Sequence, residues 1–231
     1  MQNRVERCLE PALTQPFYVG QLLVRKTTSG GFVVSNRDDE RLDQAQIFLD
    51  AEDAIEIAKY DHAGKYRPLK TAPSLRRGWR LELATVEDLQ RALDYFYPGR
   101  LAVFAAWKNG QLNTTPLRET LDRQSGMYRV AGKISDAQIN DVVADFCRSD
   151  GGCLRTILWK RDRNGAIAST KLAKEKFAPV FDQATASNPP GSATPATAET
   201  TATVPLLCQE ACNLLVAECR KVVKGEGDSN L

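Results

Sequence analysis

Five of the six cysteines in this 231-residue chain lie in two short segments near its C-terminal end. Cys147 and Cys153 flank the sequence RSDGG, and Cys208, Cys212 and Cys219 fall within PLLCQEACNLLVAECRK. The N-terminal sequence MQNRVERCLEPALTQPF has no apolar stretch typical of a secretory signal, so we expect a cytoplasmic protein. Disulfides are rare in that reducing compartment, where clustered cysteines indicate a metal, cluster or redox site.

The overall composition is that of a globular protein and argues against two classes of partner. Hydrophobic residues make up 42% of the chain and charged residues 26%, which is enough apolar material for a core without covalent staples. The net charge of +2 is too small to indicate nucleic acid as a main partner. No apolar run approaches the roughly 18 residues that a membrane span requires. We therefore expect neither nucleic acid nor membrane binding.

The first half of the chain has the pattern of a small accessory α+β domain, for which we expect residues 1–112. A glycine pair in TTSGG separates two β-rich runs and predicts a hairpin. The sequence TVEDLQRALDYFYPG predicts a helix capped by Thr85, with apolar residues at helical spacing. The other predicted elements are a short helix around Ala54–Ala58, a strand in WRLELAT and a buried strand in RLAVFAAWKNGQL.

The second half predicts a helix–strand domain interrupted by a linker. We expect residues 113–182 to form the first part of a cluster-binding domain, with a helix in TPLRETLDRQ, a strand in MYRVAGK, a helix capped by Ser135 and a strand in CLRTILWKRDRNG. Residues 183–203 are rich in Ala, Thr, Pro and Ser, which predicts a disordered linker. Residues 204–231 are predicted to form a C-terminal helix that completes the site, opened by Pro205 and closed by Gly225.

The spacing of the cysteines selects four of them as one ligand set. In the predicted last helix, Cys208 and Cys212 share a face and lie about 6 Å apart in rise. Cys219 shares that face but lies about 10 Å beyond Cys212 and about 16 Å beyond Cys208, which is too far for one small cofactor. We therefore predict that Cys147, Cys153, Cys208 and Cys212 are the ligands. Cys219 is then a packed helix residue, and Cys8 takes no part.

The spacing of these cysteines is compatible with three interpretations. A [4Fe–4S] cluster fits gaps of five and three residues, whereas structural zinc favours two to four residues within both pairs. A zinc site of four cysteines is therefore the alternative. The third interpretation is that the cysteines are simply buried in a core. The glycine pair and the tether between the two segments favour a site, because cofactor binding would close that loop and hold the last helix in place.

The residues that carry this pattern also resemble a known family. The sequence MYRVAGKISDAQINDVVADFCRSDGGCLRTILWK, followed by PLLCQEACNLLVAECRK, resembles the iron–sulfur domain attached to some CbiX-type sirohydrochlorin chelatase proteins. The sequence RRGWRLELATVEDLQRALDYFYPGRLAVFAAWKNGQL resembles the accessory domain beside it. The resemblance implies a [4Fe–4S] cluster on Cys147, Cys153, Cys208 and Cys212. It does not imply chelatase activity, since the histidine-bearing chelatase domain is missing and His62 is the single histidine.

Outside the cysteines the sequence gives weak signals. His62 lies in a polar turn and is expected on the surface. The basic loop of Lys65, Arg67, Lys70, Arg76 and Arg77 suits a tetrapyrrole carboxylate or a phosphate, but a solvated loop is the favoured interpretation. No P-loop, dinucleotide-binding motif or HExxH motif is present. The sequence therefore leaves open whether the protein is an enzyme.

These observations lead to one main functional hypothesis and two alternatives. The main hypothesis is an iron–sulfur protein with an electron-transfer or redox-sensing role, accessory to siroheme or cobalamin metabolism. One alternative is an interaction module held together by a structural zinc site, and another is an enzyme that binds a tetrapyrrole near the basic loop. The candidate partners are a redox protein, a separate chelatase protein and a tetrapyrrole.

Overall fold

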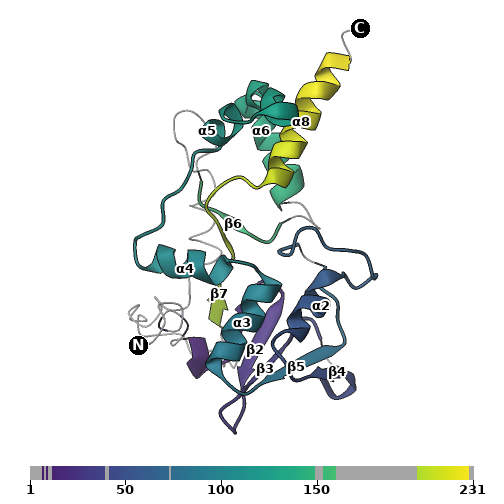
Figure 1. Cartoon of the computed structure of the whole chain (residues 1–231), viewed down its shortest axis with the longest axis vertical. Helices are drawn as coiled ribbons and strands as arrows, with labels where there is room; N and C mark the ends of the chain where they lie inside the picture. Colours follow the sequence, from purple (N-terminus) through teal and green to yellow (C-terminus); the bar gives the residue numbers. More distant parts are fainter. Residues whose placement is uncertain are drawn as a thin grey trace, which may run out of the picture.

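A six-stranded sheet forms the base of the protein. The structure is a computed structural model, and it describes residues 7, 9, 12–39, 42–72, 74–148, 153–159 and 202–228. The strand order is β4-β5-β3-β2-β1-β7; the two edge strands pair in parallel and the inner strands pair antiparallel (Figure 1). The elements of this sheet and its short 3-10 turns are η1 (Ala12–Thr14), β1 (Phe17–Val19), β2 (Leu22–Lys26), β3 (Phe32–Asn36), η2 (Leu42–Gln44), β4 (Gln46–Phe48), β5 (Trp79–Leu83) and β7 (Ala202–Val204).

The predicted hairpin is present and depends on both glycines of its turn. Strands β2 and β3 pair antiparallel, with Lys26 opposite Phe32 at the turn end. Gly30 has a φ of +93°, which residues with a Cβ rarely adopt. A Cβ added to Gly31 would lie 2.6 Å from the carbonyl oxygen of Leu83 on the neighbouring strand. The TTSGG sequence therefore fixes the turn and lets β5 approach the hairpin closely.

Three helices pack beside this sheet, namely α2 (Asp53–Lys59), α3 (Val86–Phe96) and α4 (Arg100–Lys108). As predicted, α3 begins after Thr85, whose side-chain oxygen accepts a hydrogen bond from the backbone N–H of Asp88 at 3.1 Å. Its inner face joins the core of the sheet, where the ring of Phe96 stacks on Trp79 with centroids 5.2 Å apart. The α+β class predicted from the sequence is confirmed.

The strand predicted in RLAVFAAWKNGQL is wrong, because this segment forms helix α4. Its buried side chains are Leu101, Phe104 and Ala105, which follow the three- and four-residue spacing of a helix rather than the alternation of a strand. The alanines in the segment also favour helix. Gly99 precedes α4 with a φ of +70°, a conformation that lets the chain turn sharply from α3 into α4.

A second group of helices forms the other end of the molecule (Figure 1). Helix α6 begins with the predicted cap, a capping box in which Ser135 and Gln138 exchange side-chain and backbone hydrogen bonds. The strand predicted in MYRVAGK is wrong: only Ala131 is buried there, so no alternating apolar face exists, and the segment forms η3. The elements are α5 (Leu117–Asp122), η3 (Gly126–Lys133), α6 (Asp136–Val142), η4 (Val143–Arg148) and α8 (Asn213–Asp228).

The C-terminal segment differs most from the prediction. The linker expected over 183–203 lies outside the described residues except for 202 and 203, and these belong to β7. The helix expected over 204–231 begins only at Asn213, after a second short strand, β8 (Leu207–Cys208). Pro205 does not open a helix here, because the residues on either side of it are in strands: Val204 pairs with Val19 of β1, and Leu207–Cys208 form β8. The sheet of the first domain thus takes its last strand from beyond the boundary predicted at residue 112.

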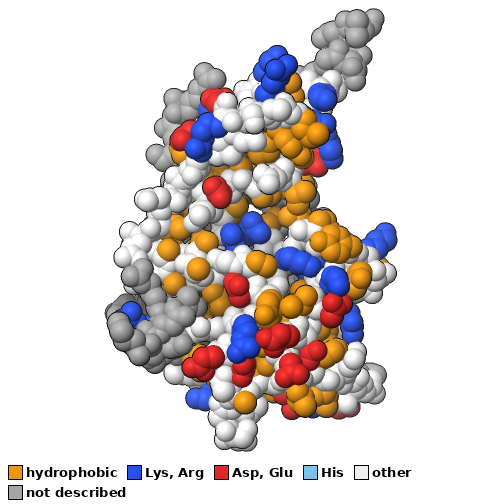
Figure 2. Space-filling model, in the orientation of Figure 1, with side chains coloured by type: hydrophobic (Ala, Val, Ile, Leu, Met, Phe, Trp, Pro, Cys, Tyr) orange, Lys and Arg blue, Asp and Glu red, His pale blue; other side chains and the backbone are white. Residues whose placement is uncertain are grey.

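Charges on the surface are mixed. On the face that Figure 2 shows, Lys and Arg side chains intermingle with Asp and Glu over the part of the molecule that contains the sheet. This agrees with the small net charge of +2. No helix in the described part of the chain has both the length and the apolar character needed to cross a membrane.

Candidate functional site

A two-stranded ribbon lies between the two hydrophobic cores. Strand β6 (Thr156–Ile157) pairs in parallel with β8, so that Ile157 lies opposite Cys208. Successive side chains of a strand point to opposite faces. Accordingly, Leu158 and Leu207 pack into the core of the sheet, whereas Ile157, Trp159 and Cys208 pack into the core of the helices. The segments that carry two predicted ligands therefore hold the two halves of the protein together.

Cys208 is the most enclosed of the four predicted ligands. Cys208 is only 8% exposed, and the indole N–H of Trp159 donates a hydrogen bond to its sulfur at 3.2 Å. The Cys208 thiol donates to the carbonyl oxygen of Glu210 at 3.0 Å. Burial raises the pKa of the Cys208 thiol, against the smaller lowering effects of the Trp159 hydrogen bond and the charge of Arg155. The site thus favours a neutral thiol until a metal replaces the proton.

Cys153 is half-buried and lies against the first domain. Its sulfur is 2.9 Å from the hydroxyl oxygen of Thr71, and the next residue, Leu154, donates its backbone N–H to the Thr71 carbonyl oxygen at 3.0 Å. The loop between α2 and β5 is therefore part of the surroundings of this cysteine. Nothing in the sequence indicates this contact, because the two residues are 82 positions apart.

Cys212 takes the capping position before α8. Its sulfur accepts a hydrogen bond from the backbone N–H of Leu215 at 3.5 Å, three residues into the turn. The positive end of the helix dipole lies here. The predicted pairing of Cys208 and Cys212 on one helix face is wrong, since Cys208 is in β8 and only Cys212 adjoins the helix.

Cys147 lies in η4, a π-helical turn that extends α6. Single π-helical turns are frequent at functional sites. Cys147 packs against the same helical core as Cys208 and Cys212. Residues 149–152, with the glycine pair between Cys147 and Cys153, are outside the described residues, as is Cys8. Cys219 is completely buried in α8, and burial raises the pKa of its thiol to about 11.

The structure brings Cys153, Cys208 and Cys212 into one neighbourhood. Cys153 and Cys212 both lie near enough to Cys208 to contribute electrostatically to the raised pKa of its thiol, although the three residues come from three different segments. Among the described residues, no three histidine, cysteine, aspartate or glutamate side chains are close enough together to hold a metal ion. The sulfur donors suit an iron–sulfur cluster in kind, and their tryptophan, threonine and helix N–H neighbours suit thiolate ligands.

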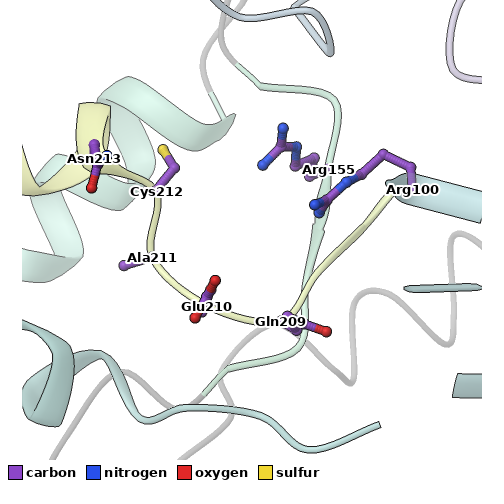
Figure 3. A pocket seen from close by; sticks show the side chains of 7 residues that line it. All are labelled: Arg100, Arg155, Gln209, Glu210, Ala211, Cys212 and Asn213. Carbon is purple, nitrogen blue, oxygen red and sulfur yellow. The ribbon is translucent and has the colours of Figure 1, made fainter. Parts of the chain in front are cut away.

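A polar cavity of about 290 Å³ adjoins Cys212. Figure 3 shows the side chains of Arg100 and Arg155 next to each other, across the cavity from Cys212. Arg100 comes from α4 and donates to the carbonyl oxygen of Leu207 at 2.8 Å. Burial, reinforced by the charge of Arg155, lowers the pKa of Arg100. The cavity is lined by Arg100, Arg155, Gln209, Glu210, Ala211, Cys212 and Asn213.

These two guanidinium groups suit a cluster held by thiolates, which is a net anion. Within the described residues, neither forms an ion pair with a carboxylate at 4.0 Å or less. Both arginines line the same cavity as Cys212, together with the carboxylate of Glu210. Arg100 could not be found from the sequence, because it lies 107 positions before the Leu207 carbonyl that it contacts.

The basic loop does not form a common binding surface. Lys65 and Arg77 are exposed, and Arg77 lies 3.4 Å from Asp38. Arg76 donates to the side chain of Gln46 at 2.9 Å. Arg67 differs from the expected solvated loop, since it is only 3% exposed. His62 is exposed, as expected for a residue in a polar turn.

Comparison with known families identifies the two halves of the chain. Residues 109–221 match a 4Fe-4S iron-sulfur cluster binding domain, and residues 4–111 match the DR2241 stabilising domain. These matches describe a region similar to the DR2241 stabilising domain, followed by a region that matches a 4Fe-4S cluster-binding domain. The [4Fe–4S] cofactor predicted from the cysteines is confirmed at the level of this family. No curated protein was found to match the chain.

The similarity to a solved structure extends over nearly the whole chain. The crystal structure of DR2241 from Deinococcus radiodurans aligns with 96% of the chain at 25% sequence identity and a TM-score of 0.70. That protein is described as multi-domain, with structural similarity to chelatases and two additional novel domains. The present chain covers 41% of the length of DR2241, so it is similar to a part of that protein.

Proposed function

We propose that the cluster of this protein carries single electrons and is held by Cys147, Cys153, Cys208 and Cys212. When bound, the cluster supplies a one-electron couple. The observation that supports this role best is the cavity beside Cys212. Two of its lining residues, Glu210 and Asn213, are exposed, so the cavity reaches the surface beside Cys212. A site of this kind lets an electron partner come close to the sulfur ligands.

The residues around the site would set the reduction potential. Positive charges and N–H groups near the sulfur atoms stabilise the more negative, reduced state of a cluster and so raise its potential. Arg100 and Arg155 provide the charges, while Trp159 and the backbone N–H of Leu215 provide the hydrogen bonds.

A reductive titration tests the redox role. The anaerobically purified protein is reduced with dithionite, reoxidised, and followed by its visible absorption. We expect the broad absorption of the cluster to bleach on reduction and to return on reoxidation, with the same midpoint potential in both directions. A cluster that stays unreduced, or that is destroyed when reduced, would refute the electron-transfer role while leaving cluster binding intact.

A link to tetrapyrrole metabolism is the finer part of this proposal. It rests on the similarity to DR2241, which is described as similar in structure to chelatases. The partner would then be a chelatase-like protein or a tetrapyrrole. A porphyrin added to the cluster-loaded protein is expected to change the visible spectrum of the cluster. If the porphyrin leaves the cluster spectrum untouched, the tetrapyrrole proposal fails.

A further inference from the structure

The loop between α2 and β5 contains a buried arginine with no acidic partner among the described residues. Arg67 is 3% exposed, and one of its terminal nitrogens donates to the carbonyl oxygens of Lys70 and Ala72, at 3.0 and 2.7 Å. Its Nε is buried without a hydrogen-bond partner. Burying a cation in this way is unfavourable, and accordingly burial lowers the pKa of Arg67. A buried arginine of this kind destabilises a surface loop unless it is needed to hold the loop backbone in a particular conformation.

The two carbonyl groups that Arg67 holds belong to the neighbours of Thr71. Thr71 is completely buried. Its hydroxyl oxygen and its backbone carbonyl oxygen both contact the segment that contains Cys153 and Leu154. The hydroxyl lies 2.9 Å from the sulfur of Cys153, and the carbonyl accepts from the N–H of Leu154. The side chain of Lys70 fixes the same loop to α2, by donating to the carbonyl oxygen of Ala58 at 2.9 Å. Thr71 is thus held on both sides, in contact with a predicted ligand.

The direction of the hydrogen bond follows from the chemistry of ligation. A cysteine that binds iron is a thiolate and has no proton to donate. The Thr71 hydroxyl must then donate to the Cys153 sulfur, since a hydroxyl can act as donor or acceptor. Hydrogen bonds of this kind to ligand sulfurs are among the features that set cluster potentials.

We propose that Thr71 donates a hydrogen bond to the cluster ligand Cys153 and that Arg67 positions Thr71 for it. The stabilising domain would then regulate the cluster directly, by raising its reduction potential, as well as packing against it. This proposal rests on the assignment of Cys153 as a ligand and adds a residue from the other domain to the redox site.

The test compares Thr71→Val, which removes the hydroxyl but keeps the shape, with Thr71→Ser, which keeps the hydroxyl. Both variants are expected to bind as much iron and sulfide as the wild type. The midpoint potential is expected to shift to more negative values in Thr71→Val and to stay near the wild-type value in Thr71→Ser. A wild-type potential in Thr71→Val with full iron content would overturn the proposal.

Arg67→Lys tests the positioning residue, with Arg77→Lys as the matched control in the same loop. A lysine keeps the charge but lacks the planar fork of the guanidinium, so it cannot reproduce its geometry. We expect Arg67→Lys to shift the potential in the same direction as Thr71→Val, and Arg77→Lys to leave it unchanged. Equal potentials in the two arginine variants would contradict the positioning role.

A second readout separates this proposal from the electron-transfer role. The stretching frequencies between iron and cysteine sulfur, measured by resonance Raman spectroscopy, report the hydrogen bond without any reduction step. We expect them to differ between wild type and Thr71→Val even if the cluster does not cycle reversibly. Identical frequencies would refute the role of Thr71, whereas failure of the titration with altered frequencies would refute only the electron-transfer function.

Discussion

The Cys208→Ala variant is expected to lose its [4Fe–4S] cluster, and with it the visible absorption of the protein. Cys208 is held in β8 by the hydrogen bond from Trp159 and by its pairing with Ile157, so no other sulfur can take its position without rearranging the ribbon. Cys219→Ala is the matched control, because it also removes a buried sulfur from the helical core. That control is expected to keep the full absorption.

The same pair of variants should differ in stability. Because a metal site that forms only in the folded state adds its binding free energy to folding, Cys208→Ala loses that contribution entirely. Cys219→Ala loses only packing, which is on the order of 1 kcal/mol for a group of this size. Thermal unfolding of the anaerobic proteins measures the difference. If Cys219→Ala lost the cluster and Cys208→Ala kept it, the assignment of ligands would be wrong.

Replacing Trp159 by alanine is expected to have a large effect on packing. Trp159 is completely buried between β6 and the helices, and truncation of a buried tryptophan costs about 3–5 kcal/mol. The free energy of unfolding, from urea titration of the cluster-loaded protein, should fall by this amount. A decrease below about 1 kcal/mol would show that the core around the ribbon does not depend on this ring.

Trp159→Phe separates packing from the hydrogen bond to Cys208. It keeps most of the buried ring but has no N–H to donate to the sulfur. We expect a much smaller loss of unfolding free energy than in Trp159→Ala, together with a more negative reduction potential. An unchanged potential would mean that the indole N–H does not affect the cluster.

The parts of the fold that the sequence predicted are those in which local chemistry is decisive. The glycine pair at the hairpin turn, the Thr85 cap of α3 and the Ser135 cap of α6 each act within a few residues. The clustering of cysteines likewise indicates the kind of cofactor, because thiolates are the ligands that iron–sulfur clusters require. In these places the local preference and the final fold agree.

The wrong predictions concern elements whose structure is decided by contacts between residues distant in the sequence. A short apolar run suits a strand or a buried helix equally, and α4 became a helix by packing Leu101 and Phe104 into the core of the sheet. Strand β7 has only three residues, and its partner Phe17–Val19 lies about 185 positions earlier in the sequence. Strand β8 has only two residues, and its partner Thr156–Ile157 lies about 50 positions earlier. Sequence periodicity cannot reveal pairs of this kind.

Contacts between residues distant in the sequence also limited the prediction of the site. The thiols were predictable because cysteine is rare and its ligand chemistry is specific. The residues that surround them were not, since Thr71 and Arg100 come from the first domain and reach the cysteines only through the tertiary fold. The first domain therefore provides side chains to the site as well as a surface for the second domain to pack on.

The measurement that tests the central claim most directly is a count of iron, zinc and acid-labile sulfide per chain after anaerobic purification. It is combined with a visible spectrum recorded before and after dithionite. A [4Fe–4S] cluster on the four cysteines predicts about four iron and four sulfide per chain, with a broad absorption that bleaches on reduction. One zinc per chain and no sulfide would contradict the account and would make the cysteines a structural zinc site.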